Sequence, residues 1–337
     1  MNFAQRFCEL LSPWYYDLTV KVPDFPRWMH LESTNYCNAN CYFCPHKTLR
    51  RGLGYMDVKL FERAVDEIGI YGVRRLTLHL MGEPLLHPEI FNMVAYAKTK
   101  PKIQMVDFST NGALLTEAKI DGVMRAGLDV INVDMDGATA ATYENARRGL
   151  KFETTVRNLR NLIEAVHASA TRKPHIKLQV IQTPAVQAEM DLFWEIWKPI
   201  LAGKTCVEVF LKKYEWWSGA KPEDVQSTAD WGTPGPLYVR LPCGMLERQM
   251  NVFWNGEVNH CCLDANGDLK IGDFREQSLM EIWQGAPAQK LRALVRDGSY
   301  AKIKPCDGCI RSPAKRFFSR RDLSLEPLKR LARRKEF

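Results

Sequence analysis

The chain has 337 residues, a formal net charge of +8 and a hydrophobic content of 46%. This length and composition suffice for one large domain with a smaller one, and they exclude an intrinsically disordered chain. The sequence contains neither a secretory signal pattern nor a run of about eighteen apolar residues, so it predicts a cytoplasmic protein. In that reducing setting the ten cysteines are expected to serve metal or redox chemistry rather than a disulfide framework.

Strand-like and helix-like segments alternate through the first two thirds of the chain. Amphipathic helices are predicted at residues 57–68, 88–99, 116–126, 154–168 and 189–201, between strands at residues 28–34, 74–81, 102–110, 130–136, 176–183 and 206–213. Six repeats of this β/α order predict an α/β fold, a partial (β/α)6 barrel with a parallel sheet. In such a barrel the active site lies at the carboxyl ends of the strands.

The pattern changes after Lys213. Asn255-Gly256 predicts a hairpin between residues 250–254 and 257–262, and a helix is predicted at residues 278–284. Five of the ten cysteines lie in this region, which predicts a small α+β metal-bearing module. The expected organisation is an N-terminal extension, the barrel, this auxiliary module and a basic tail, at residues 1–27, 28–213, 214–312 and 313–337.

The positive charge is concentrated in the tail. Residues 311–337 contain ten Lys or Arg and three acidic residues, a local charge of +7, so the rest of the chain is nearly neutral. A basic patch confined to one tail gives little support for nucleic-acid binding, and no nucleic-acid partner is expected. The leucines spaced along the tail are compatible with weak contact to an anionic membrane surface, or with a solvated helix.

The first cysteine motif follows the first predicted strand. Cys37, Cys41 and Cys44 have the spacing Cys-x3-Cys-x2-Cys. Three closely spaced thiolates hold three irons of a 4Fe-4S cluster and leave the fourth iron open. On this motif alone, zinc with a distant fourth ligand such as His46 is the alternative.

Further motifs resemble the radical S-adenosylmethionine (SAM) superfamily, over roughly residues 28–312. Residues 81–84 (Met-Gly-Glu-Pro) are similar to the family's Gly-Gly-Glu-Pro segment, with Met81 in place of the first glycine. Residues 109–112 (Ser-Thr-Asn-Gly) are similar to its ribose- and carboxylate-contacting motif. Through this resemblance and positions at strand ends, we expect SAM to contact Phe43, Gly82, Glu83, Pro84, Ser109, Asn111, Asp134, Arg147 and Gln179.

The resemblance implies a specific chemistry for the first cluster. Cys37, Cys41 and Cys44 would be its catalytic ligands, and the open iron would chelate SAM and cleave it to a 5'-deoxyadenosyl radical. Such a radical removes hydrogen from an unactivated carbon, so the protein must exclude water and position that carbon. The electron would come from a flavodoxin or ferredoxin partner.

A second set of cysteines resembles the single-cluster "twitch" form of the SPASM auxiliary domain. Its ligands to a second 4Fe-4S cluster would be Cys243, Cys261, Cys306 and Cys309. Cys262 is the alternative to Cys261, because neighbouring residues of a strand face opposite sides. A structural zinc ribbon is the other interpretation of this set. Four thiolates leave no open iron, so the expected role is electron transfer.

The spacing of these four cysteines is most similar to that of the radical dehydrogenase that oxidises the aminocyclitol 2-deoxy-scyllo-inosamine. The expected function is therefore radical SAM oxidation of a small polar substrate, which would be a carbohydrate, an aminocyclitol or a nucleoside. Only 36 residues precede Cys37, which favours such a substrate over a peptide. The alternatives are an epimerase with Cys262 as hydrogen donor, a peptide-modifying enzyme, and a non-catalytic iron-sulfur or zinc protein.

Overall fold

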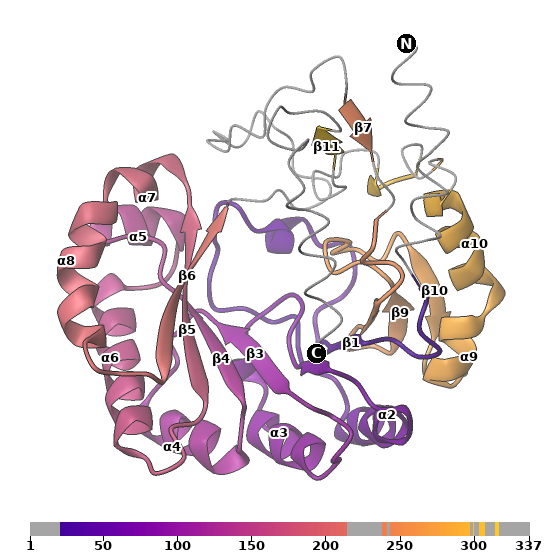
Figure 1. Ribbon diagram of the computed structural model, residues 1–337, viewed down its shortest axis with the longest axis horizontal. Helices are drawn as coiled ribbons and strands as arrows, with labels where there is room; N and C mark the ends of the chain where they lie inside the picture. Colours follow the sequence, from indigo (N-terminus) through magenta and orange to yellow (C-terminus); the bar gives the residue numbers. More distant parts are fainter. Residues whose placement is uncertain are drawn as a thin grey trace, which may run out of the picture.

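The computed structural model describes residues 21–213, 238–240, 243–296, 299, 303–306 and 314–316. Within them, six strands pair in parallel in chain order, with helices on the outer side (Figure 1). The predicted partial barrel is confirmed. Its strands are β1 (Trp28–Leu31), β2 (Arg75–Thr77), β3 (Val106–Thr110), β4 (Val130–Asp134), β5 (His175–Gln182) and β6 (Val207–Lys213).

The five long helices of the barrel lie where the apolar spacing predicts them. On α6, for example, Leu159, Ile163 and Val166 recur at helical spacing and are fully buried. The helix ends follow local chemistry, since Asp57 and Thr116 cap helices by accepting backbone N–H bonds. The helices are α2 (Val58–Tyr71), α3 (Ile90–Lys98), α4 (Glu117–Ala126), α6 (Phe152–Ala168) and α8 (Met190–Leu201).

Several short helices were not predicted. They are too short for a clear apolar period and are held by their surroundings. The helix at residues 140–146, for instance, begins after Thr139, whose side chain accepts a hydrogen bond from Thr142 N–H and caps the helix. These short elements are η1 (Pro45–Thr48), η2 (Pro84–Leu86), α5 (Ala140–Ala146) and α7 (Pro184–Ala188). The longer helix α10 (Ala286–Arg296) of the auxiliary part was also not predicted, although Ala288, Leu291 and Val295 recur on its buried face.

The first two strands end earlier than predicted, at Leu31 and Thr77. The residues after each strand form two loops, which are hydrogen-bonded to each other and do not continue the parallel strand pairing. Ser33 Oγ donates to the Leu78 carbonyl at 2.8 Å, and Glu83 N–H donates to the Tyr36 carbonyl at 2.8 Å. The loop before the first cysteine is thereby fastened to residues 78–83.

The auxiliary part joins the barrel sheet. β8 (Gln249–Val252) pairs in parallel with β1, and the predicted hairpin to β9 (Glu257–Asn259) is confirmed. Gly256 has φ +88° in its turn, a conformation that favours glycine. β10 (Lys270–Asp273) completes a nine-stranded sheet, and α9 (Leu279–Gln284) matches the last predicted helix.

Two further strands, β7 (Tyr238–Arg240) and β11 (Ala314–Arg316), form a separate antiparallel pair. Most of the basic tail lies outside the described residues, and so does Cys309. Among the described residues no helix has the length and apolarity needed to span a bilayer.

Candidate metal centre and cofactor cavity

A cavity of about 260 Å3 lies at the carboxyl ends of the parallel strands. It receives side chains from the cysteine loop, from β1 and β3 to β6, from the loop after β2 and from the auxiliary hairpin. The structure brings together on its wall ten of the predicted residues, namely Cys37, Cys41, Phe43, Cys44, Gly82, Ser109, Asn111, Asp134, Arg147 and Gln179.

The three thiols of the first motif face this cavity from a loop that backbone hydrogen bonds fasten to the barrel. Asn40 N–H donates to the Arg148 carbonyl at 2.7 Å, and Tyr42 N–H donates to the Ala146 carbonyl at 3.2 Å. No three His, Cys, Asp or Glu side chains among the described residues are close enough to share one metal ion. All three thiols nevertheless line one cavity, and a cubane takes one thiolate at each of three separate irons.

The chemistry of the donors also fits an iron-sulfur cluster. Thiolates are soft ligands that suit such clusters. Burial raises the pKa of Cys37 to about 11 and that of Cys44 to about 12. The thiols are therefore protonated before metal binds, and ligation must release their protons.

Arg147 places a buried positive charge beside these thiols. Its Nε donates to Asp136 Oδ2 at 2.7 Å, and its Nη2 lies 3.0 Å from Asp134 Oδ2. Its Nη1 lies 3.8 Å from Cys41 Sγ, and its guanidinium carbon lies 5.4 Å from the centroid of the Phe43 ring. Burial raises the pKa of Cys41, and the charge of Arg147 opposes that rise. Arg147 lines the cavity, whereas its neighbour Arg148 is exposed.

Gly82 allows the loop after β2 to approach the cysteine loop. Its φ is +89°, and a Cβ there would lie 2.6 Å from the Thr34 carbonyl and 2.7 Å from that of Tyr36. Only glycine fits such a position without strain. Met81, which occupies the family's first glycine position, is buried, so the fold accommodates a side chain at this position.

Glu83 and Pro84 do not line the cavity, in contrast to the other predicted SAM contacts. The Glu83 carboxylate accepts hydrogen bonds from Thr110 Oγ1 at 2.7 Å and from Asn111 N–H at 2.8 Å. Burial raises the pKa of Glu83 to about 7. Pro84 is the buried first residue of η2. In the structure Glu83 therefore positions the 109–112 loop, and Met81 and Gly82 form the cavity wall.

Two polar pairs fix the remaining predicted side chains. Gln179 Nε2 donates to Asp134 Oδ1 at 2.7 Å, and Asn111 Nδ2 donates to Asn38 Oδ1 at 2.8 Å. The second pair ties the third strand's loop to the cysteine loop. Both pairs order side chains on the cavity wall before any ligand binds.

The neighbouring cysteines of the auxiliary hairpin separate in space. Cys261 packs against the hydrophobic core, as do Cys243 and Cys306. Cys262 instead lines the cavity with the first three thiols. This division agrees with Cys261 as the auxiliary ligand, while the fourth predicted ligand, Cys309, lies outside the described residues.

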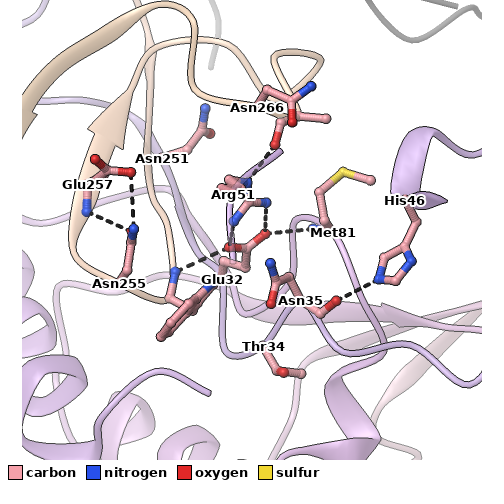
Figure 2. Close-up of polar contacts among 12 residues, drawn as sticks. Glu32, Thr34, Asn35, His46, Arg51, Met81, Asn251, Asn255, Glu257 and Asn266 are labelled. Carbon is pink, nitrogen blue, oxygen red and sulfur yellow. Dashed lines mark hydrogen bonds and ion pairs between the residues drawn. The ribbon is translucent and has the colours of Figure 1, made fainter. Parts of the chain in front are cut away.

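A buried ion pair joins the barrel to the auxiliary hairpin (Figure 2). Arg51 donates to both carboxylate oxygens of Glu32, at 2.5 Å each, and its Nε donates to the Ala265 carbonyl at 2.6 Å. Glu32 also accepts from the backbone N–H groups of Met81 and Trp254, at 3.2 Å each. One carboxylate thus connects β1, the loop after β2 and the auxiliary hairpin.

Sequence reasoning missed two cavity residues, His30 and His79, and gave no site role to Lys212, which also lines the cavity. His30 stands on a short strand between buried apolar neighbours, and His79 stands just beyond β2. A polar residue at an alternate position of a buried strand was the available signal. That pattern alone does not distinguish a histidine that faces a cavity from a core histidine whose ring nitrogens are hydrogen-bonded within the protein.

Comparisons with known proteins agree with this geometry. A model of the radical SAM superfamily matches residues 31–172, and a model of the SPASM iron-sulfur cluster-binding domain matches residues 243–310. The AdoMet-dependent heme synthase of Methanosarcina barkeri (strain Fusaro) is 32% identical over 334 residues, covering 86% of this chain and 93% of that protein.

Two further comparisons show the range of similar proteins. The GTP 3',8-cyclase of Chlorobaculum tepidum is 30% identical over 165 residues, 49% of each protein, so this chain spans about half the length of that relative. The crystal structure of BtrN in complex with AdoMet and 2-DOIA superposes with a TM-score of 0.58 at 18% identity, covering 87% of this chain and 97% of BtrN. This last likeness concerns the fold alone.

Proposed function

Because the chain belongs to the radical SAM superfamily and carries a SPASM iron-sulfur domain, we propose that it oxidises a small polar substrate by hydrogen abstraction. Its cofactors are SAM and two 4Fe-4S clusters. The substrate class that we propose is a carbohydrate, an aminocyclitol or a nucleoside. The second electron of the oxidation passes to the auxiliary cluster.

One observation carries this proposal. The cavity that contains the first three thiols is also lined by Cys262 and Leu263, which follow β9 of the auxiliary part. A substrate held there would lie beside the first three thiols and beside Cys262, the chain neighbour of the proposed auxiliary ligand Cys261.

The roles of the residues follow from their positions. Cys37, Cys41 and Cys44 would hold the first cluster, which when bound supplies the electron that cleaves SAM to a 5'-deoxyadenosyl radical. Arg147 would balance the thiolate charge. Met81 and Gly82, together with Ser109, Asn111 and Gln179, would orient SAM; the auxiliary ligands would be Cys243, Cys261, Cys306 and Cys309. A flavodoxin or ferredoxin would supply the electron.

Epimerisation is a second candidate, and the position of Cys262 favours it. A redox-neutral epimerase must return a hydrogen atom to the substrate radical, and a thiol is a suitable donor. Cys262 lines the cavity, whereas Cys261 does not. A peptide substrate would fit the same chemistry, but no feature of the described cavity favours it.

Reaction in D2O separates the two candidates. Oxidation gives a product without solvent deuterium at the reacting carbon, whereas epimerisation through a thiol introduces one deuterium there. Cys262→Ala is the matched variant. It should leave oxidation and the iron content intact, whereas Cys261→Ala should remove the auxiliary iron. Deuterium in the product that disappears with Cys262→Ala would replace oxidation with epimerisation.

A further inference from the structure

Two imidazoles face the cavity without belonging to either cysteine set. His30 lies on β1 and His79 follows β2, and both line the cavity. The two rings meet edge to face, with centroids 6.5 Å apart. They form a compact polar pair in a wall that otherwise contains several apolar side chains.

One nitrogen of each ring is held by the protein. Ser109 N–H donates to His79 Nδ1 at 2.9 Å, so the neutral ring of His79 carries its proton on Nε2. His30 Nδ1 lies 2.9 Å from the side-chain amide of Asn251. Neither Nε2 has a hydrogen-bond partner among the described residues, and neither belongs to the buried atoms that lack one. Both Nε2 atoms are therefore accessible from the cavity.

The surroundings of these two imidazole rings favour the neutral form over the protonated form. Burial lowers the pKa of His30 to about 4 and that of His79 to about 3, and the nearby positive charges of Arg75 and Lys212 contribute to the low value for His79. Both rings are neutral near pH 7. Neutral imidazoles form hydrogen bonds with hydroxyl groups, whereas a phosphate or carboxylate is bound better by cations.

Building on the proposed function, we propose that His30 and His79 are substrate-binding residues that hold neighbouring hydroxyl groups of a neutral ring polyol. His79 Nε2–H donates to one hydroxyl oxygen, and His30 Nε2 contacts the next. The T-shaped arrangement offers two hydrogen-bonding atoms, one from β1 and one from the loop after β2, to one face of the substrate. These residues thus determine which hydroxyl-bearing carbon faces the radical.

Stimulation of 5'-deoxyadenosine formation tests this proposal. The holoenzyme, anaerobically reconstituted and reduced with dithionite, is titrated with scyllo-inositol, scyllo-inosamine, glucose, adenosine and glucose 6-phosphate. The variants are His79→Leu and His79→Gln, and the matched control is His167→Leu on the outer helix α6. Iron content, SAM binding and unstimulated SAM cleavage are measured for each protein.

We expect at least one neutral polyol to stimulate the wild type. His79→Leu should raise the KM for that polyol about tenfold, the effect of one lost hydrogen bond. His79→Gln, which keeps an N–H donor, should restore part of the affinity, and His167→Leu should not differ from the wild type. The unstimulated cleavage of His167→Leu should equal that of the wild type, and the KM change of His79→Leu is read relative to that variant's own unstimulated cleavage and SAM binding.

The contrary outcomes are distinct. Equal KM values for wild type and His79→Leu would overturn this inference and leave the proposed function intact. Stimulation by glucose 6-phosphate alone, or by no compound of the panel, would also overturn it, the former in favour of an anionic substrate near Lys212. No 5'-deoxyadenosine from the wild type under any condition would refute the proposed function itself.

Discussion

Arg51 and Glu32 form a buried bidentate ion pair, with the Arg51 side chain 6% exposed and the Glu32 side chain 0% exposed. The pair fastens the end of β1 to the auxiliary hairpin, because Arg51 also reaches the Ala265 carbonyl. Glu32 also accepts from Met81 N–H, so the loop after β2 and the auxiliary part share one electrostatic anchor (Figure 2).

Removing one partner of this ion pair should destabilise the folded protein. Arg51→Met leaves a buried uncompensated carboxylate, so we expect the free energy of unfolding in urea to fall by about 3–5 kcal/mol. Arg50→Met is the control, because the neighbouring pair of Arg50 with Asp268 is exposed and should contribute about 1 kcal/mol or less. Equal losses for the two variants would show that Arg51 is not an anchor.

Gly82 should tolerate no side chain. Gly82→Ala adds a Cβ that overlaps the backbone of residues 34–36 at a φ of +89°, so we expect a loss of roughly 2–6 kcal/mol in stability. SAM binding should weaken in parallel, because the cysteine loop moves. Gly244→Ala, with no atom within 4 Å of its new Cβ, should change stability by about 0.5 kcal/mol or less. Wild-type behaviour of Gly82→Ala would contradict this packing.

Glu83 should make stability depend on pH. Its folded pKa of about 7 lies above the ordinary value of 4.5, so the native state binds the proton more tightly. The contribution of Glu83 is therefore most favourable below about pH 4.5 and declines as the pH rises towards 7, by up to about 3 kcal/mol. We expect the unfolding free energies of wild type and Glu83→Gln to diverge in this direction between pH 5 and 8. A constant difference across that range would contradict the shift.

Much of the fold was predictable because it depends on local patterns. The alternation of apolar strands with amphipathic helices gave six β/α repeats in the right order, and Asn255-Gly256 marked the hairpin. The strand ends at Leu31 and Thr77 were not predictable. They depend on hydrogen bonds between two loops, such as that from Glu83 N–H to the Tyr36 carbonyl, and no local pattern reports these.

The candidate site was predictable where motifs carry the chemistry. The cysteine loop, Gly82 and residues 109–111 were found this way, and ten predicted residues line one cavity. Strand alternation was expected to turn Cys261 and Cys262 to opposite sides, but β9 ends at Asn259 and both cysteines lie in the loop after it, where Cys262 lines the cavity. His30 and His79 were missed because only the pairing of β1 with β2 brings them together.

The most direct test of the central claim is the iron content and SAM cleavage of the anaerobically reconstituted chain. Two cubanes predict roughly eight irons per chain, and reduction with SAM present should give 5'-deoxyadenosine. Replacing Cys37, Cys41 and Cys44 with Ala should leave roughly four irons and abolish 5'-deoxyadenosine. Tightly bound zinc instead of iron, or cleavage that persists in the triple variant, would contradict the account.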